Sequence, residues 1–282
     1  MRCDSHVHIV GPPDRYPQVP QRTYLAGVAS LDALQRNGRA RGIDRFVIVQ
    51  PSFYGTDNSA LLDALDALDA LGEPGRGVAV VDPLAVGAKA LDDYARRGVR
   101  GLRINLYSHL GGANRLEAIF GATANVARQM GWHVEVIAPM PSIVDSADLI
   151  ARASVPVVVD HYGLHGRLRP ESASGRRFLD LLRLPHVWMK LSAPYRNVDY
   201  ALETHPDPEW IVAILDVAAE RCVWGSDWPF TAAHDQHRGP TIIAPYRDIA
   251  YETVVDEFLA ALPSRDLADA LMEKNPARLY GF

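Results

Sequence analysis

The stretch Cys3-Asp4-Ser5-His6-Val7-His8-Ile9 decides the architecture of this chain. Its composition is typical of a buried β-strand, and side chains two residues apart point to the same face of a strand, so both imidazoles lie on one side. Two histidines that merely share a face would also explain the pair, because short motifs often occur by chance. The later predicted strands also end in ionisable residues, which favours a shared functional site.

Short apolar runs alternate with helical stretches along the rest of the chain. After a Pro-rich loop at 11–24, helical spacing covers 30–41 and the run 46–49 predicts a second strand. Further strands are predicted at 77–84, 101–106, 134–138, 155–161, 187–193 and 222–228, and further helices at 59–71, 87–97, 114–130, 142–152, 172–184 and 208–220. The aspartates of 59–71 fall opposite leucines and predict a solvated helix face rather than a metal site.

Eight apolar strands, each followed by a helix, indicate a parallel sheet covered on both faces. We therefore predict an α/β fold, a closed (β/α)8 TIM barrel, formed as a single domain by residues 1–282. A doubly wound open sheet is the alternative, but no GxGxxG motif follows an early strand.

Composition excludes several classes of partner. The chain has 282 residues, 48% of them hydrophobic and 22% charged, with a net charge of -5. No basic patch stands out, so we expect no nucleic acid and no anionic membrane surface as partner. Cys3 and Cys222 lie in strand-like runs and form no CxxC pair, which predicts buried reduced thiols. The sequence shows no signal-peptide pattern and no apolar segment long enough to span a membrane, so we expect a cytoplasmic protein. It indicates no particular oligomeric state.

Polar side chains gather where the predicted strands end. The active site of such a barrel lies at the C-terminal ends of its strands. Polar groups within buried strands are costly unless paired, so their convergence predicts a site. The residues at these ends are His6, His8, Ser52, Arg103, Asn105, Glu135, His161, Lys190, Ser192 and Asp227.

Several motifs carry a resemblance to known families. His6-Val7-His8, Asp160-His161 and Gly225-Ser226-Asp227-Trp228-Pro229 resemble the amidohydrolase superfamily. Longer motifs, in order along the chain, resemble the 2-pyrone-4,6-dicarboxylate lactonase family within it: Val49-Gln50-Pro51-Ser52-Phe53, Gly55-Thr56-Asp57-Asn58, Gly101-Leu102-Arg103-Ile104-Asn105, Lys190-Leu191-Ser192-Ala193-Pro194-Tyr195-Arg196 and Asn275-Pro276-Ala277-Arg278-Leu279-Tyr280-Gly281-Phe282. The resemblance covers essentially the whole chain and implies hydrolysis of a small-molecule lactone, a cyclic ester.

The resemblance and the strand-end position together suggest Asp227 as a general base that accepts a proton from the attacking water. An aspartate that only orients a histidine is the alternative. His6, His8 and His161 would then polarise the lactone carbonyl and stabilise the oxyanion.

The same four side chains, His6, His8, His161 and Asp227, are also a partial ligand set for a divalent ion. Metal-bearing superfamily members usually add a histidine at the end of strand five or another ligand from strand four or five, whereas here His133 begins strand five and reads as structural. The resembled lactonases require no metal. We therefore expect no required cofactor, with Zn2+ and a metal-bound water as the alternative.

Arg103 and Arg196 match positions that grip substrate carboxylates in the resembled family, a task that suits the guanidinium fork. Structural ion pairs are the alternative, especially for Arg103. Two further family arginines are missing, because the chain has Tyr107-Ser108-His109 and Leu164 there. A lactone with one carboxylate, or a less charged one, therefore fits better than a dicarboxylate. His109 or His165 would partly compensate. Ser52, Tyr54 and Thr56 are predicted hydrogen-bonding residues of the pocket wall, although turn chemistry alone would explain Ser52 and Thr56.

Three hypotheses follow. The chain is a lactone hydrolase; or a metal-dependent amidohydrolase or decarboxylase on the same barrel; or a barrel that binds a ligand without chemistry. Both strand-one histidines, His161 and Asp227 are present, which argues against the third.

Overall fold

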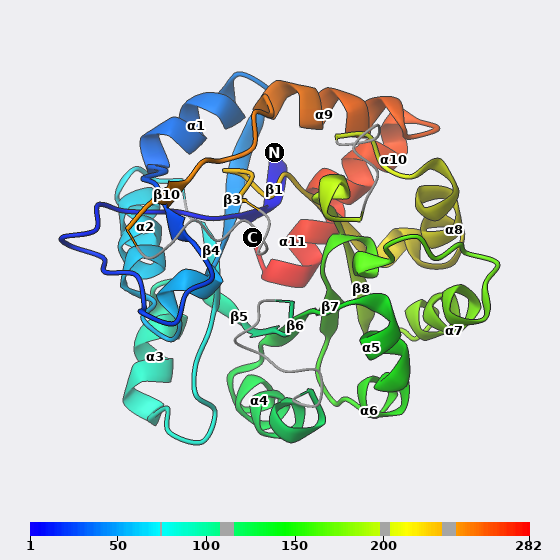
Figure 1. Ribbon diagram of the computed structural model, residues 1–282, viewed down its shortest axis with the longest axis horizontal. Helices are drawn as coiled ribbons and strands as arrows, with labels where there is room; N and C mark the ends of the chain where they lie inside the picture. The colour runs from blue at the N-terminus through cyan, green and yellow to red at the C-terminus, as the bar shows by residue number, and fades with distance from the viewer. Residues whose placement is uncertain (74, 108–115, 198–203, 233–240) are drawn as a thin grey trace.

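Eight parallel strands form the centre of the computed structural model, which describes residues 1–73, 75–107, 116–197, 204–232 and 241–282. They pair in the order β1-β3-β4-β5-β6-β7-β8-β9, with helices around the outside (Figure 1). The strands are β1 (Arg2–Val7), β3 (Ile43–Val49), β4 (Arg76–Ala79), β5 (Val99–Asn105), β6 (His133–Ile137), β7 (Val157–Val159), β8 (Val187–Ser192) and β9 (Cys222–Gly225). The predicted (β/α)8 barrel is confirmed.

The first and last barrel strands meet at a seam. Val7 forms a parallel bridge with Trp228. The His8 N–H donates to the Trp228 carbonyl at 2.8 Å, and the Asp227 N–H donates to the His6 carbonyl at 2.9 Å. The seam therefore closes the barrel with the same residues that carry the predicted chemistry.

A helix follows every barrel strand, in most cases after a loop or a short 3-10 turn. The outer layer consists of α1 (Leu31–Arg39), α2 (Ser59–Ala70), α3 (Ala88–Arg96), α4 (Leu116–Met130), α5 (Met140–Asp145), α6 (Ala147–Ala151), α7 (Ala173–Leu182), α8 (Pro208–Ala218) and α9 (Tyr251–Ala260). On α2 the leucines are buried while Asp66 and Asp69 are exposed, as expected for a solvated face. No helix in the ranges given above is long and apolar enough to cross a membrane.

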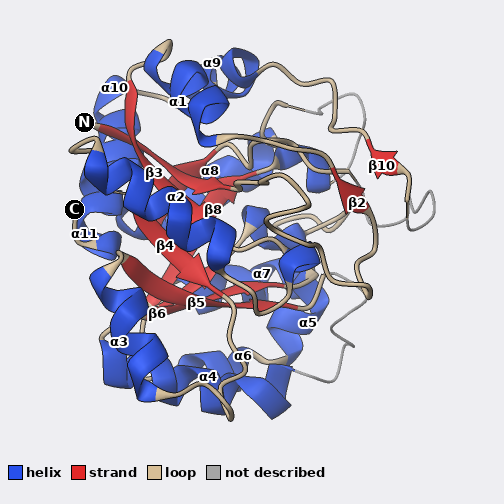
Figure 2. Cartoon of the chain, turned by 90° about the vertical axis from the view of Figure 1, so that its left-hand side faces the viewer, coloured by secondary structure: helices blue, strands red, loops and turns tan. Residues whose placement is uncertain are grey.

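The two ends of the barrel are covered differently. The C-terminal segment α10 (Arg265–Asp269) and α11 (Asn275–Tyr280) lies at the end where the strands begin (Figure 2). There Arg76 Nε donates to the Tyr280 carbonyl at 3.1 Å, and Asn275 Nδ2 donates to the Cys222 carbonyl at 2.7 Å. A small parallel sheet of β2 (Leu25–Ala26) and β10 (Ile243–Ala244), which the sequence did not predict, lies at the opposite end.

Several strands end earlier than predicted, β4 by the most residues. β4 ends at Ala79 rather than at residue 84, because the Asn58 side chain bonds to both backbone groups of Val80. Asn58 Oδ1 accepts the Val80 N–H at 3.0 Å, and Asn58 Nδ2 donates to the Val80 carbonyl at 2.8 Å. β7 ends at Val159, since His161 to Leu164 adopt positive φ. β9 ends at Gly225, two residues before Asp227. Cys3 and Cys222 are buried free thiols, as predicted.

Replacing Gly225 by Ala should destabilise the barrel at its seam. An added Cβ would lie 2.6 Å from His6 Cβ and 2.7 Å from the His6 backbone nitrogen. Such overpacking typically costs about 1–3 kcal/mol. Gly121→Ala is the matched control, because an added Cβ there meets nothing within 4 Å and favours the helix. Urea unfolding of both variants measures the difference, and equal stabilities would contradict the close contact at the seam.

Candidate active site

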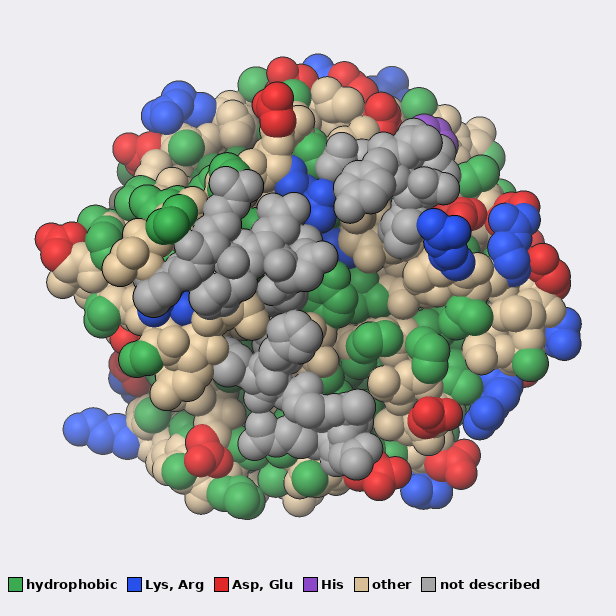
Figure 3. Space-filling view, in the orientation of Figure 1, with side chains coloured by type: hydrophobic (Ala, Val, Ile, Leu, Met, Phe, Trp, Pro, Cys, Tyr) green, Lys and Arg blue, Asp and Glu red, His purple; other side chains and the backbone are tan. Residues whose placement is uncertain are grey.

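A small pocket opens at the carboxyl ends of the strands, on the face seen in Figures 1 and 3. Its volume is about 20 Å³, which is room for a single water molecule. The pocket is lined by His8, Tyr24, Pro51, Ser52, Arg103, Asn105, Tyr107, Ile137, His161, Arg196, Asp227 and Thr231. Side chains from β1, β5 and the segments that follow β3, β7, β8 and β9 thus meet at one mouth.

Asp227 occupies the centre of this group. It follows β9 in a left-handed conformation, with φ of 64°, which turns its carboxylate into the barrel. Oδ1 lies 3.2 Å from His8 Nε2, 3.5 Å from His6 Nε2 and 3.9 Å from His161 Nε2. The other oxygen, Oδ2, accepts hydrogen bonds from the Tyr195 hydroxyl and from Arg196 Nε at 2.9 Å.

The Asp227 carboxylate stays ionised although it is fully buried. Burial alone would raise its pKa, but the Arg196 guanidinium above all, together with the adjacent His161, His8 and His6 side chains, holds that pKa well below its ordinary value. Burial and the Asp227 charge also raise the pKa of Tyr195 well above its usual range, so the phenol remains a donor. The pocket therefore holds a permanent, oriented negative charge.

The imidazoles around this charge differ in how they are held. Burial lowers the pKa of His161 to about 3 and that of His6 well below its ordinary value, so both rings are neutral near pH 7. The Ser192 hydroxyl lies 2.8 Å from His161 Nδ1. A hydroxyl that donates to Nδ1 leaves the ring proton on Nε2, on the side of Asp227.

His8 presents the opposite arrangement. Its Nδ1 lies 2.7 Å from the Val49 carbonyl, which can only accept, so Nδ1 carries a proton. The neutral ring would then turn the lone pair of Nε2 toward Asp227 Oδ1, 3.2 Å away. A protonated ring or a cation between the two atoms removes this repulsion.

These groups also fit a divalent metal ion. Ligand atoms of His6, His8 and Asp227 lie within 4.8 Å of one another, as do those of His6, Asp160 and His161. A histidine whose Nδ1 donates to a backbone carbonyl and whose Nε2 faces the site is the usual arrangement of a metal ligand. The donor set therefore suits zinc, with His6, His8 and Asp227 as the residues that would hold it.

A second layer of buried charges lies beneath the histidines. Lys190, from β8, forms an ion pair with Glu135 and lies 3.4 Å from Asp160. Arg103 donates to Asp160 at 2.9 Å, and its Nε lies 3.3 Å from Glu135. His6 Nδ1 lies 3.5 Å from Asp160 Oδ1. The network thus connects strands β5, β6 and β8 to the strand-one histidine.

The pKa values of the two carboxylates in this layer, Glu135 and Asp160, are shifted in opposite directions. Burial and the nearby Asp160 charge raise the pKa of Glu135 to about 7. Burial acts the same way on Asp160, but Lys190, His6 and Arg103 overcome it and hold the pKa of Asp160 well below its ordinary value. Asp160 therefore carries the lasting negative charge behind His6.

The other predicted site residues lie in different places. Ser52 lines the pocket, whereas Thr56 lines a neighbouring cavity. The Tyr54 hydroxyl is turned to the loop after β1, where it accepts from the Gly11 N–H at 3.2 Å. His109 lies outside the residues that the structure describes.

The sequence did not predict the contact between Tyr195 and Asp227, nor that Arg103 and Lys190 form buried ion pairs with Glu135 and Asp160. Tyr195 stood only in a motif beside Arg196, yet its hydroxyl is bonded directly to Asp227. Arg103 NH1 donates to the Gln50 carbonyl at 3.2 Å, and Arg196 NH2 donates to the Thr231 hydroxyl at 2.6 Å. Each arginine also bonds to a protein carboxylate while it lines the pocket, Arg103 to Asp160 at 2.9 Å and Arg196 to Asp227 at 2.8 Å.

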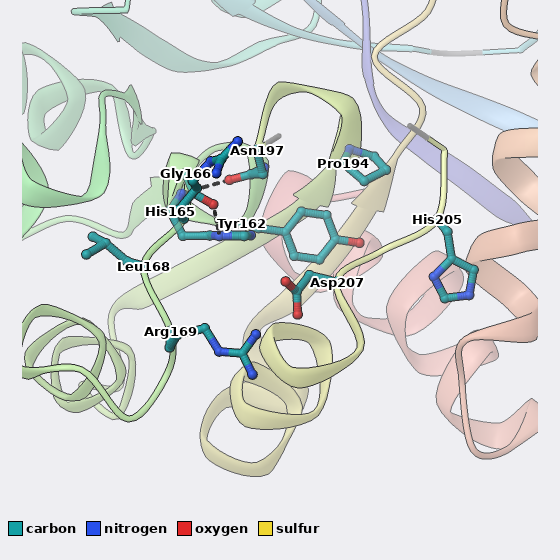
Figure 4. A pocket seen from close by; sticks show the side chains of 10 residues that line it. Tyr162, His165, Gly166, Leu168, Arg169, Pro194, Asn197, His205 and Asp207 are labelled. Atoms are coloured by element: carbon teal, nitrogen blue, oxygen red, sulfur yellow. Dashed lines mark hydrogen bonds between the residues drawn. The ribbon is translucent and has the colours of Figure 1, made fainter. Parts of the chain in front are cut away.

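A separate cavity of about 250 Å³ lies behind the loops that follow β7 and β8 (Figure 4). His165 borders it, stacked on Trp210, and its backbone N–H donates to Asn197 Oδ1 at 2.7 Å. Asn197 Nδ2 donates in turn to the His161 carbonyl at 2.8 Å. His165 therefore belongs to this cavity and not to the mouth around Asp227.

A closed barrel with histidines and an aspartate at its carboxyl mouth has the architecture of a barrel enzyme. Residues 3–282 match the family model described as amidohydrolase, and the chain belongs to this family.

Its relatives include hydrolases named for lactone substrates. A 4-sulfomuconolactone hydrolase from Rhizobium radiobacter is 29% identical and is covered over 89% of its length by 99% of this chain. A 2-pyrone-4,6-dicarboxylate hydrolase from Comamonas testosteroni is 28% identical, with 98% of this chain and 89% of the relative covered. A solved amidohydrolase from Burkholderia multivorans, with bound zinc, has a TM-score of 0.70 over 100% of this chain and 99% of its own. At 23% identity that likeness shows the fold alone.

Removing the buried ammonium of Lys190 should strongly destabilise the protein. Lys190→Met leaves the carboxylates of Glu135 and Asp160 with Arg103 alone of their two shared cations, and the loss of a buried ion-pair partner typically costs about 3–5 kcal/mol. Because Glu135 protonates readily, the double variant Lys190→Met/Glu135→Gln should recover part of the loss. Urea unfolding at pH 7 measures both variants. A cost below about 1 kcal/mol for Lys190→Met would contradict the network.

Proposed function

We propose that the protein hydrolyses a lactone, with Asp227 as the base that activates water. The observation that carries this proposal is the ionised, buried Asp227 carboxylate, whose Oδ1 faces three imidazole Nε2 atoms in a pocket with room for one water. The two relatives named for lactone substrates support the same reaction class.

In the proposed reaction, the water gives a proton to Asp227 Oδ1 while its oxygen bonds to the carbonyl carbon of the lactone. The Nε2–H of His161 and the Nε2–H of a doubly protonated His8 donate to the oxyanion of the tetrahedral intermediate, next to the ring of His6, as it forms. The bond between that carbon and the ring oxygen then breaks, and the ring oxygen takes the proton from Asp227. The products are a free hydroxyl and a carboxylic acid, and Asp227 is regenerated.

Tyr195 and Arg196 position this base. Both bond to Oδ2, which leaves Oδ1 directed at the imidazoles and the water. The cost is a carboxylate of low basicity, because Arg196 helps to keep its pKa low. Tight placement of the water offsets that loss, since pre-organised geometry contributes many powers of ten to the rate.

The charge on the proposed substrate is small. Arg103 and Arg196, the two arginines expected to grip carboxylates, already face Asp160, Glu135 and Asp227. We therefore propose a lactone with one carboxylate or none, held by the remaining N–H groups of these arginines and by the Ser52 hydroxyl.

A zinc-dependent hydrolase is the second candidate, and the orientation of His8 favours it. Zinc held by His6, His8 and Asp227 would supply a bound water of lowered pKa and a Lewis acid. Asp160 would then keep His6 oriented through Nδ1, and Arg196 would fix the second oxygen of Asp227.

Asp227→Asn should lower kcat/KM for lactone hydrolysis by at least a thousandfold while the fold is kept, because the amide cannot accept the proton of water. The matched control is Asp69→Asn on the exposed face of α2, which should keep full activity. Initial rates and circular dichroism measure the two properties. Turnover by Asp227→Asn within tenfold of the parent would rule out Asp227 as the base.

Removal of metal separates the two candidates. We expect protein that has been incubated with a chelator and dialysed to retain its rate within twofold, at a metal content far below one ion per chain. Mass spectrometry of the metals and initial rates are measured on the same sample. Loss of turnover that is restored by Zn2+ but not by Mg2+ would instead support the zinc-dependent reaction.

A further inference from the structure

A larger cavity adjoins the catalytic pocket. Its volume is about 470 Å³, and it shares the side chains of Ser52, Arg103 and Asn105 with the pocket around Asp227. Because the catalytic pocket has room only for a water, the body of a substrate must extend toward this shared rim. We call the larger space the β4 chamber, because it lies beyond the carboxyl end of β4.

The early end of β4 creates this space. Once Asn58 has bonded both backbone groups of Val80, the chain leaves the sheet. The ionisable residue of this segment that lines the chamber, Asp82, is exposed, and its Oδ1 accepts the Leu84 N–H at 3.0 Å. Instead, Val80, Val81 and Leu84 line the chamber. Leu84 is 88% exposed, an unusually open position for a large apolar side chain.

The opposite wall is mostly apolar. Ile119 and Ala122 of α4 line the chamber, together with Ile104 of β5 and Leu106, which follows that strand; Thr56 and Thr123 are polar residues of the lining. Ala122 has a small side chain, so a larger residue at this position would project into the chamber. The polar groups Ser52, Arg103 and Asn105 are the ones shared with the catalytic pocket.

This division indicates what kind of molecule fits. A lactone ring needs hydrogen-bond donors and a base, which the catalytic pocket holds. A chain that extends from the ring along Val80, Val81, Ile119 and Leu84 meets apolar walls, where each buried CH2 is favourable and a second carboxylate would lose its hydration. Arg103, at the rim, is already engaged by Asp160 and Glu135.

We propose that the β4 chamber binds an apolar substituent of the lactone, so that the preferred substrates are alkyl- or aryl-substituted lactones rather than dicarboxylates. This inference rests on the proposed lactone hydrolysis and adds the substrate class.

The experiment measures kcat/KM for γ-lactones with linear alkyl groups from methyl to hexyl on the ring carbon that bears the ring oxygen. We expect kcat/KM to rise about two- to fourfold with each added CH2, as burial of apolar surface requires. Failure to hydrolyse any lactone would contradict the proposed function itself. Hydrolysis with no dependence on chain length, or with strong preference for a dicarboxylate, would overturn the proposed role of the β4 chamber and leave the proposed lactone hydrolysis standing.

Ala122→Phe tests the location. It should lower kcat/KM for the hexyl lactone at least tenfold and leave the methyl lactone within twofold. Asn125→Phe is the matched control, because it adds the same ring to an exposed position of α4 that does not line the chamber, and both substrates should stay unchanged.

Leu84→Asp tests the location a second time, by placing a charge in the chamber lining at an exposed position where the fold tolerates it. It should weaken the dependence on chain length without changing the methyl lactone. Equal effects of Ala122→Phe and of Leu84→Asp on both lactones would overturn the proposal.

Discussion

The compensation of a single buried charge, the carboxylate of Asp227, governs the site. Burial opposes ionisation, yet Arg196, Tyr195 and three histidines keep the group charged and oriented. The partners come from three places, namely β1 and the residue that follows it, the end of β7 and the turn after β8, so the charge is tolerated only when the barrel is closed. The seam between β1 and β9 therefore serves both stability and the proposed chemistry, because it fixes the backbone of both His6 and Asp227.

The layer beneath makes this arrangement rigid. Lys190, Glu135, Asp160 and Arg103 fill the barrel interior with paired charges, where an ordinary barrel would hold apolar side chains. Such pairs contribute little net stability, but they restrict geometry, since each group loses much if it moves away from its partner. With α11 covering the other end of the barrel, the chemistry is confined to the carboxyl mouth.

Much of this could be predicted from the sequence. Alternating apolar strands and helices predict the barrel, and His6, His8, His161 and Asp227 do converge, because the ends of parallel strands share one edge. The partners of each group could not be predicted, since spacing along the chain does not say that Tyr195 reaches Asp227 or that Lys190 reaches Glu135. The predicted end of β4 at residue 84 was wrong for a similar reason. The apolar run 77–84 is typical of a strand, and the strand ends at Ala79 because the side chain of Asn58, distant in sequence, bonds to the backbone of Val80.

Single-turnover hydrolysis in water enriched with 18O tests the central claim that Asp227 activates water rather than attacking the lactone itself. With enzyme in excess over substrate, the account predicts that every molecule of acid product carries one 18O in its new carboxylate, while the peptide containing Asp227 keeps its natural mass. Unlabelled product in the first turnover, with 18O recovered in the Asp227 carboxylate, would contradict the account, because it would mean that the carboxylate is the nucleophile.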